Sequence, residues 1–283
     1  MRNLHIPSRS PAYAKNAMVA TSHPDATKNA LKIIEKGGNA FDAAIAAAAI
    51  LGVVEAHSTG LGGDCFCIFY SQKDKTVKAI NGSGVSISNI DYDKVKVTEN
   101  NTIDPYCADA VTIPGAVAAW LKINADYGSL SMHDLLSPAV NFAENGYVVA
   151  DVIADMWVRE TEKLKKDEDC QRVFLKESKP FSAGELHFQP ELAKTMREIA
   201  KNGREGFYNG WVAEDIVKKL NSIGGRHTLN DFAKLEVAYV EPIFSHYRDY
   251  KVFECPPNGQ GIVALMILNI LQEFDVSSLG PDS

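Results

Sequence analysis

The chain has 283 residues, of which 46% are hydrophobic and 23% charged, so it is long enough to bury a substantial core and does not have the composition of a disordered segment. Lysine and arginine number 29 against 36 aspartates and glutamates, which gives a formal charge of −7. No basic cluster is interleaved with aromatic residues, and this argues against a nucleic-acid-binding surface and an anionic lipid surface.

The cellular location is predicted from the N-terminus and the cysteines. Residues 1–11 lack the continuous apolar run of a secretion signal, and no later stretch reaches the length of a membrane span. The five cysteines are an odd number scattered along the chain, which is typical of free thiols rather than of a disulfide framework. We therefore expect a cytoplasmic protein without a membrane segment.

The first predicted elements are a buried helix and two strands. Asn39 and Asp42 have the spacing of a capping box, and the helix that they open, over 41–51, is small and apolar on nearly every face. Apolar residues at 65–70 and 76–80, with a polar turn between them, predict two strands.

A glycine-rich loop over 57–64 joins this helix to the first strand. Phosphate-binding loops follow a strand and open a helix, whereas this loop follows a helix and opens a strand, so nucleotide binding is disfavoured. Two interpretations stay open. The loop is either a tight structural turn, which we favour, or a wall of a substrate pocket.

The second half of the chain is mainly helical in pattern. Caps and apolar periodicity predict helices over 115–127, 131–146, 190–203 and 211–222, a short helix that opens at Thr228, and a solvated helix and loop within the charged stretch 151–186. Alternation of apolar and polar residues over 236–246 and 250–255 predicts two paired strands with a turn at 247–249. The last predicted helix, 261–274, has a wide apolar face.

Several ordered motifs resemble the γ-glutamyltranspeptidase family of N-terminal-nucleophile hydrolases. They are Met-Val-Ala-Thr-Ser-His-Pro (18–24), Lys-Gly-Gly-Asn-Ala-Phe-Asp-Ala-Ala (36–44), Gly-Val-Val-Glu-Ala-His-Ser-Thr-Gly-Leu-Gly-Gly (52–63), Ala-Ile-Asn-Gly-Ser-Gly (79–84), Thr-Ile-Pro-Gly-Ala-Val (112–117), Gly-Phe-Tyr (206–208) and Pro-Pro-Asn-Gly-Gln-Gly (256–261). So many motifs in one order make a chance match improbable.

The resemblance implies a fold, a mechanism and partners. It implies an α/β (α+β) fold, an incomplete four-layer αββα sandwich, and we expect residues 1–283 to form a single domain. Family members are precursors that cut themselves and expose a threonine nucleophile at the start of a second, smaller subunit. We assign no catalytic residue in this chain, no cofactor and no metal. The expected partners are that small subunit and a small amide or γ-glutamyl-like substrate, and we expect the isolated chain to expose apolar surface and to aggregate.

One departure from the family pattern concerns the substrate. In glutathione-processing members, an arginine after the second strand binds the α-carboxylate of the γ-glutamyl group through its bidentate fork. Alignment places Ser83 at that position, and no arginine occurs between Arg9 and Arg159. The resemblance implies that Asn81 and Ser83 bind substrate. It also places the chain nearer to a divergent branch with cephalosporin-acylase-like and oxamate-amidase-like members than to glutathione-processing enzymes.

Three hypotheses about function follow from the sequence. The favoured one is the N-terminal large-subunit part of a self-processing amidohydrolase or acyltransferase. The second is a catalytically silent binding or scaffold remnant of that family. The third is a thiol enzyme that uses Cys65 or Cys67, which share one face of a strand, together with His57. Core packing of the two cysteines and a capped or buried His57 are the simpler interpretations.

Overall fold

The computed structural model describes residues 11–279. The prediction that the N-terminus carries no secretion signal concerns residues almost all of which lie outside the described part. The helices are α1 (Pro24–Glu35), α2 (Ala40–Val54), α3 (Ala116–Tyr127), α4 (Met132–Asn145), α5 (Asp151–Leu164), α6 (Glu168–Phe174), α7 (Pro190–Arg204), α8 (Trp211–Ser222), α9 (Leu229–Ala233) and α10 (Gly261–Leu271), with short helical turns η1 (Tyr92–Lys94), η2 (Ala108–Ala110), η3 (Glu205–Asn209) and η4 (Val276–Ser278). The strands are β1 (Cys65–Ser71), β2 (Thr76–Gly82), β3 (Tyr147–Val148), β4 (Leu175–Lys176), β5 (Lys179–Pro180), β6 (Leu186–His187), β7 (Ala238–Val240), β8 (Ile243–Tyr247) and β9 (Tyr250–Glu254).

Helix α2 is the centre of the helical body, as its sequence predicts. Asn39 Oδ1 accepts hydrogen bonds from the backbone N–H groups of Phe41 and Asp42, and the Asp42 carboxylate accepts from the N–H of Asn39, so the capping box is confirmed. Its small side chains let α1, α3 and α4 pack closely around it. The Asp42 carboxylate also accepts from the N–H of Ser129, which ties the start of α2 to the α3–α4 connection.

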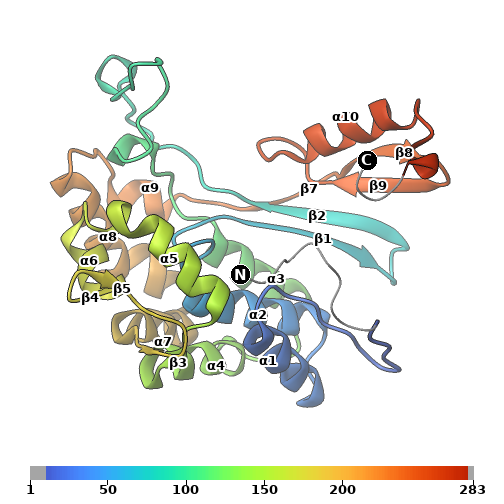
Figure 1. The fold of residues 1–283 in the computed structure, drawn as a ribbon, viewed down its shortest axis with the longest axis horizontal. Coiled ribbons are helices and arrows are strands. Elements are labelled where there is room, and N and C mark those ends of the chain that lie inside the picture. Colours follow the sequence, from blue (N-terminus) through green and yellow to red (C-terminus); the bar gives the residue numbers. More distant parts are fainter. Residues whose placement is uncertain (1–10, 280–283) are drawn as a thin grey trace.

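A three-stranded antiparallel sheet, in the order β1-β2-β7, lies against these helices (Figure 1). Helix α3 contacts β1 and β2 on one face of the sheet, and Cys65 and Cys67 are half-buried on β1. Phe66, Ile68 and Tyr70 alternate with them and are exposed. In the described residues the sheet therefore has one face covered by helices and one face open, as an incomplete sandwich requires.

The prediction of a single strand over 236–246 is wrong. Strand β7 ends at Val240 and pairs with β2, whereas β8 begins at Ile243 and forms a separate hairpin with β9. Pro242 stands between the two strands. Proline has no N–H to give to a sheet and restricts the residue before it, so the chain changes direction there.

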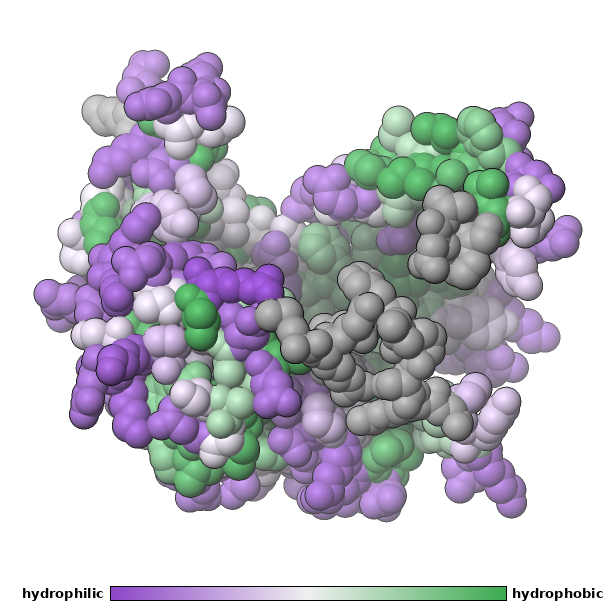
Figure 2. Space-filling model, in the orientation of Figure 1, coloured by the Kyte–Doolittle hydropathy of each residue, from purple (hydrophilic) through white to green (hydrophobic). Residues whose placement is uncertain are grey.

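The β8–β9 hairpin and α10 form a unit beside the sheet (Figure 1). Leu265 of α10 is buried, whereas Ile262 and Met266 are exposed, so only part of the predicted apolar face is surface in the described structure. Ile270, outside the predicted face, is also exposed. Figure 2 shows this face as a continuous hydrophobic patch over α10.

The charged stretch 151–186 buries more than its sequence predicts. Trp157 of α5 is buried, and its ring packs edge-on against the rings of Phe174 and His187. The His187 imidazole is hydrogen-bonded to the hydroxyl of Tyr147 at 3.0 Å, and burial lowers its pKa. The prediction of a solvated helix and loop thus holds only for the outer face, because the inner face carries a small aromatic core.

A long loop over 84–113 leaves the end of β2 and returns to the same place. The N–H of Ile113 donates to the carbonyl oxygen of Val85 at 2.9 Å, which closes the loop at its base. Asp231, which is 8% exposed, holds the loop to α9. One carboxylate oxygen accepts from the N–H and hydroxyl of Ser88, and the other accepts from the N–H and hydroxyl of Thr228.

Replacing Asp231 by asparagine should destabilise the protein, because an amide nitrogen would face groups that donate hydrogen bonds to a carboxylate. We expect a loss of about 1 to 3 kcal/mol in the free energy of unfolding, measured by urea titration. Burial raises the pKa of Asp231, but the hydrogen bonds from Ser88 and Thr228 outweigh it and lower this pKa to about 2.

The lowered pKa also gives the pH dependence. The stability contributed by Asp231 should be complete above the pKa of an unfolded aspartate, about 4, and should be lost as the pH falls from there towards about 2. The difference in unfolding free energy between wild type and Asp231→Asn should shrink over that interval. A difference that stays constant from pH 6 to pH 3 would contradict this account.

Candidate functional site

The predicted substrate residues Asn81 and Ser83 lie at the end of β2, where the chain packs very closely on the start of α3. A Cβ on Gly115 would lie 2.1 Å from the carbonyl oxygen of Gly82, and a Cβ on Gly82 would lie 2.5 Å from the Cβ of Ala119. Only glycine at 82 and 115 allows this approach without displacement of the backbone. The glycines thus fix where β2 ends relative to α3.

Two further groups hold the start of α3 in place. The carbonyl oxygen of Gly63, in the glycine-rich loop, accepts from the N–H groups of Gly115 and Ala116 at 3.1 and 3.0 Å. The buried hydroxyl of Tyr208, in η3, donates to the carbonyl of Pro114 at 2.7 Å and accepts from the N–H of Ala118 at 3.0 Å. These bonds use N–H groups that a helix start otherwise leaves unpaired, so this helix start is engaged with protein groups.

The glycine-rich loop also reaches the site through a carboxylate. Asp64 Oδ1 accepts from the N–H of Gly84 at 2.9 Å, one residue after Ser83. Gly63 serves the tight turn that we favoured, with its N–H bonded to the carbonyl of Gly60 at 3.2 Å. Gly60 and Gly62 do not need to be glycine for that turn, because a Cβ on either would meet nothing within 4 Å and neither has a positive φ.

A third polar side chain joins Asn81 and Ser83. The N–H of Ser83 donates to Asn81 Oδ1 at 2.9 Å, Asn81 Nδ2 donates to Asn258 Oδ1 at 3.0 Å, and Asn258 Nδ2 donates to Ser83 Oγ at 2.5 Å. We call Asn81, Ser83 and Asn258 the amide cluster. Sequence reasoning missed Asn258: the segment Pro-Pro-Asn-Gly-Gln-Gly (256–261) counted only as one motif of the family resemblance, and no role was given to its asparagine.

A cavity of about 470 Å³ adjoins the amide cluster between β1 and the segment that leads into α10. Its lining residues are Phe66, Ile68, Glu254, Cys255, Gly259, Gln260 and Gly261. Asn258 directly precedes the lining residue Gly259. The site therefore combines the neutral amide cluster with a cavity whose lining contains apolar side chains and one carboxylate, Glu254. Apolar walls with a few polar groups are the common composition of a small-molecule pocket.

The cysteines and His57 are not assembled for thiol chemistry. Burial, and then the neighbouring Cys67, raise the pKa of Cys65 to about 11, and burial raises the pKa of Cys67. Such thiols are protonated at neutral pH and are poor nucleophiles. The expectation of a capped or buried His57 is wrong, because its side chain is exposed and lines a different cavity with Trp157 and Cys170.

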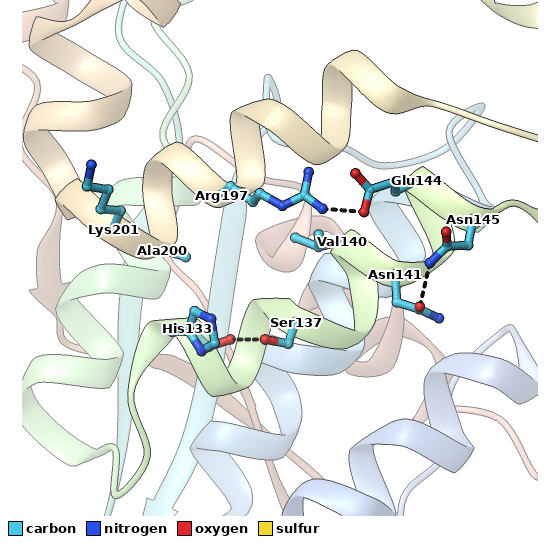
Figure 3. Close-up of a pocket in the computed structure, with 9 residues that line it drawn as sticks. All are labelled: His133, Ser137, Val140, Asn141, Glu144, Asn145, Arg197, Ala200 and Lys201. Atoms are coloured by element: carbon cyan, nitrogen blue, oxygen red, sulfur yellow. Dashed lines mark hydrogen bonds and ion pairs between the residues drawn. The ribbon is translucent and has the colours of Figure 1, made fainter.

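A larger groove lies between α4 and α7 (Figure 3). Arg197 and Glu144 point toward one another across it and form an ion pair, and Asn145 donates to Asn141 at 2.8 Å. Its polar side chains pair with one another at the surface, which is typical of a solvated groove between two helices. Of these three hollows, the one beside the amide cluster is the best candidate.

No group of three or more histidine, cysteine, aspartate or glutamate side chains within residues 11–279 is placed to hold a metal ion. No helix in the same range combines the length and the apolar character that crossing a membrane requires.

The family profile described as gamma-glutamyltranspeptidase matches residues 26–283. The chain belongs to the gamma-glutamyltranspeptidase family. It is 40% identical over 267 residues to the glutathione hydrolase-like YwrD proenzyme of Bacillus subtilis. This alignment covers 93% of the present chain and 50% of that protein. The chain is 32% identical to the glutathione hydrolase proenzyme of Escherichia coli, in an alignment that covers 95% of the present chain and 47% of the relative. The chain thus spans about half the length of the curated relatives that it matches.

Two solved structures confirm the fold. The Helicobacter pylori gamma-glutamyltranspeptidase superposes with a TM-score of 0.88 at 29% identity, over 97% of this chain and 80% of that chain. The cephalosporin acylase of Bacillus halodurans superposes with a TM-score of 0.82 at 33% identity, over 96% of this chain and 53% of that chain. The predicted mixed helix-and-sheet class and the predicted family are therefore confirmed.

Gly115→Ala should strongly perturb the site, because its Cβ would lie 2.1 Å from the Gly82 carbonyl oxygen. We expect a loss of about 1 to 3 kcal/mol in unfolding free energy, the usual cost of overpacking, measured on the full-length protein by urea titration. Lys218→Ala is the control, since this side chain is exposed on α8, and its effect should stay within about 0.5 kcal/mol. Equal losses in the two variants would contradict this packing argument.

Alkylation separates the amidohydrolase hypothesis from the thiol-enzyme hypothesis. With the pKa of Cys65 at about 11, iodoacetamide at neutral pH should modify Cys65 much more slowly than a free cysteine, and the rate should rise as the pH approaches that value. Mass spectrometry of tryptic peptides measures the extent of modification. Amide hydrolysis by the full-length protein should persist after alkylation, and its complete loss together with modification of Cys65 or Cys67 would support the thiol enzyme.

Proposed function

We propose that this chain is the N-terminal, large-subunit part of a self-processing amidohydrolase or acyltransferase that acts on a small amide. Membership of the gamma-glutamyltranspeptidase family supports the reaction class. Two curated relatives that bear the name proenzyme are matched over about half of their length, which supports a precursor with a second subunit segment. In this proposal the threonine nucleophile comes from that second segment, where its own α-amine acts as the base.

The amide cluster supports a substrate other than a standard γ-glutamyl group. Ser83 stands where the resemblance implies a carboxylate-binding arginine, and its hydroxyl is bonded to a neutral carboxamide, Asn258. A hydroxyl cannot form the bidentate charged pair that arginine forms with a carboxylate. The substitution at position 83, which leaves the amide cluster without a cation, is the observation that carries the proposal.

The second segment also accounts for surfaces that the described residues leave open. The exposed side chains of β1 and α10 are apolar, and apolar patches of this kind mark contact surfaces. Gly60 and Gly62 leave room beside the glycine-rich loop for a close approach by another backbone. We propose that the small subunit packs on the open face of β1 and makes the loop a wall of the substrate pocket.

We also propose that residues 1–283 form a single domain, that the protein is cytoplasmic, and that it has no nucleic-acid or membrane partner. The cysteines support a reducing compartment, because all five are free thiols in the structure. Subcellular fractionation tests the location. The catalytically silent remnant is the alternative function, and the next experiment distinguishes it.

The decisive experiment expresses the full-length reading frame and follows its processing and activity. We expect mass spectrometry to show two chains, the smaller one beginning with threonine. We also expect release of p-nitroaniline from γ-glutamyl-p-nitroanilide with a kcat/KM about 100-fold below that of the Escherichia coli relative. This ratio corresponds to the loss of about 3 kcal/mol of charged hydrogen bonding. Ser83→Arg should recover part of this difference.

Two other results would change the proposal. Efficient γ-glutamyl transfer by the wild-type protein, equal to that of the relative, would overturn the claim about the acyl group. A full-length protein that stays uncut and hydrolyses no amide would favour the silent remnant. Replacing the terminal threonine of the smaller chain by alanine is the control, since it should abolish both processing and activity.

A further inference from the structure

The hydrogen-bond directions in the amide cluster are determined by one backbone group. The N–H of Ser83 can only donate, so the Asn81 atom that faces it at 2.9 Å must be the carbonyl oxygen. The Asn81 nitrogen therefore faces Asn258, whose oxygen must accept, and the Asn258 nitrogen donates to Ser83 Oγ. The orientation of both carboxamides follows from this chain of donors and acceptors.

The same directions leave donors unused. Each carboxamide nitrogen has two hydrogens and spends one of them within the cluster. Ser83 Oγ accepts from Asn258, so its own hydrogen is available, and its one recorded acceptor is the carbonyl of Gly84 at a long 3.4 Å. Asn81 and Ser83 are only half-buried and Asn258 is exposed, so a ligand can reach these donors.

The charges next to the cluster are negative. The Asp64 carboxylate accepts from the N–H of Gly84, beside Ser83. Glu254 lines the adjoining cavity. Among the described residues, the hydrogen bonds of the cluster side chains involve no lysine or arginine. A carboxylate ligand would therefore meet like charges without a cation, whereas a neutral acceptor would meet only donors.

We propose that Asn258, with Ser83 and Asn81, forms a neutral donor site that binds an uncharged carbonyl group on the acyl part of the substrate, with the aliphatic stem of that acyl group against Phe66 and Ile68. This inference rests on the proposed amidohydrolase function and narrows its substrate class. Asn258 is a specificity-determining residue in this account, because it sets the direction of the Ser83 hydroxyl.

The test compares three p-nitroanilides on the full-length protein. Oxohexanoyl-p-nitroanilide ends in a methyl ketone, glutaryl-p-nitroanilide has the same shape but ends in a carboxylate, and hexanoyl-p-nitroanilide has no acceptor. We expect kcat/KM for the ketone to exceed both others by about 10-fold, the effect of one or two neutral hydrogen bonds. A preference for glutaryl would overturn the proposal.

Asn258→Asp tests the donor role directly. An aspartate still accepts from Asn81 but forces the Ser83 hydroxyl to donate inward, so the outward donors at both positions are lost. We expect kcat/KM for the ketone to fall about 10-fold while that for hexanoyl changes less than about 3-fold. Ser83→Ala should also lower kcat/KM for the ketone selectively. Asn145→Asp, on α4 and outside the site, should leave kcat/KM for both substrates unchanged.

The outcomes separate this inference from the proposed function. Equal losses for the ketone and hexanoyl substrates in Asn258→Asp would assign Asn258 a structural role only and overturn the inference. If no p-nitroanilide is cleaved, the proposed function fails. NMR titration with oxohexanamide and hexanamide then tests separately whether the amide cluster binds a neutral carbonyl group. The inference then predicts tighter binding of oxohexanamide by wild type and no such difference in Asn258→Asp.

Discussion

The close approach of Gly82 to Gly115 is the constraint on which the site depends. Because neither residue has a side chain, the end of β2 lies directly against the start of α3, with no room for even a methyl group between them. Gly63 and Tyr208 then hold the start of α3 from two other segments. Four regions that are distant in sequence therefore fix one point, and Asn81 and Ser83 project from that point.

This rigid point carries side chains that differ chemically from the arginine that the family resemblance implies. The backbone geometry is supplied by glycines and by main-chain hydrogen bonds, so the residue at position 83 can change without loss of the fold. Serine in place of a cation removes charge from the site, and the negative groups nearby, Asp64 and Glu254, then favour neutral ligands. A fold can therefore keep its backbone framework while the side chains at its site change the ligand that it binds.

The surfaces around the site have a related meaning. The sheet is packed by helices on one face only, and α10 shows apolar side chains to solvent in the described structure (Figure 2). The site lies between these two surfaces, because Asn258 links the α10 unit to the end of β2. Any segment that covers β1 and α10 would therefore also enclose the amide cluster and its cavity, so the proposed assembly and the proposed ligand site share one surface.

The sequence by itself determined the local elements, since their causes lie within a few residues. The Asn39 capping box, the short helix that opens at Thr228 and the helix limits at Trp211 and Gly146 were all predicted, because caps and periodicity are local properties. Tertiary structure alone decided that β7 leaves its neighbour at Pro242 to pair with β2, and that Asn258 meets Ser83 across 175 residues. Neither contact has a periodic or capping signal, because each arises only when the packed sheet and helices bring distant segments together.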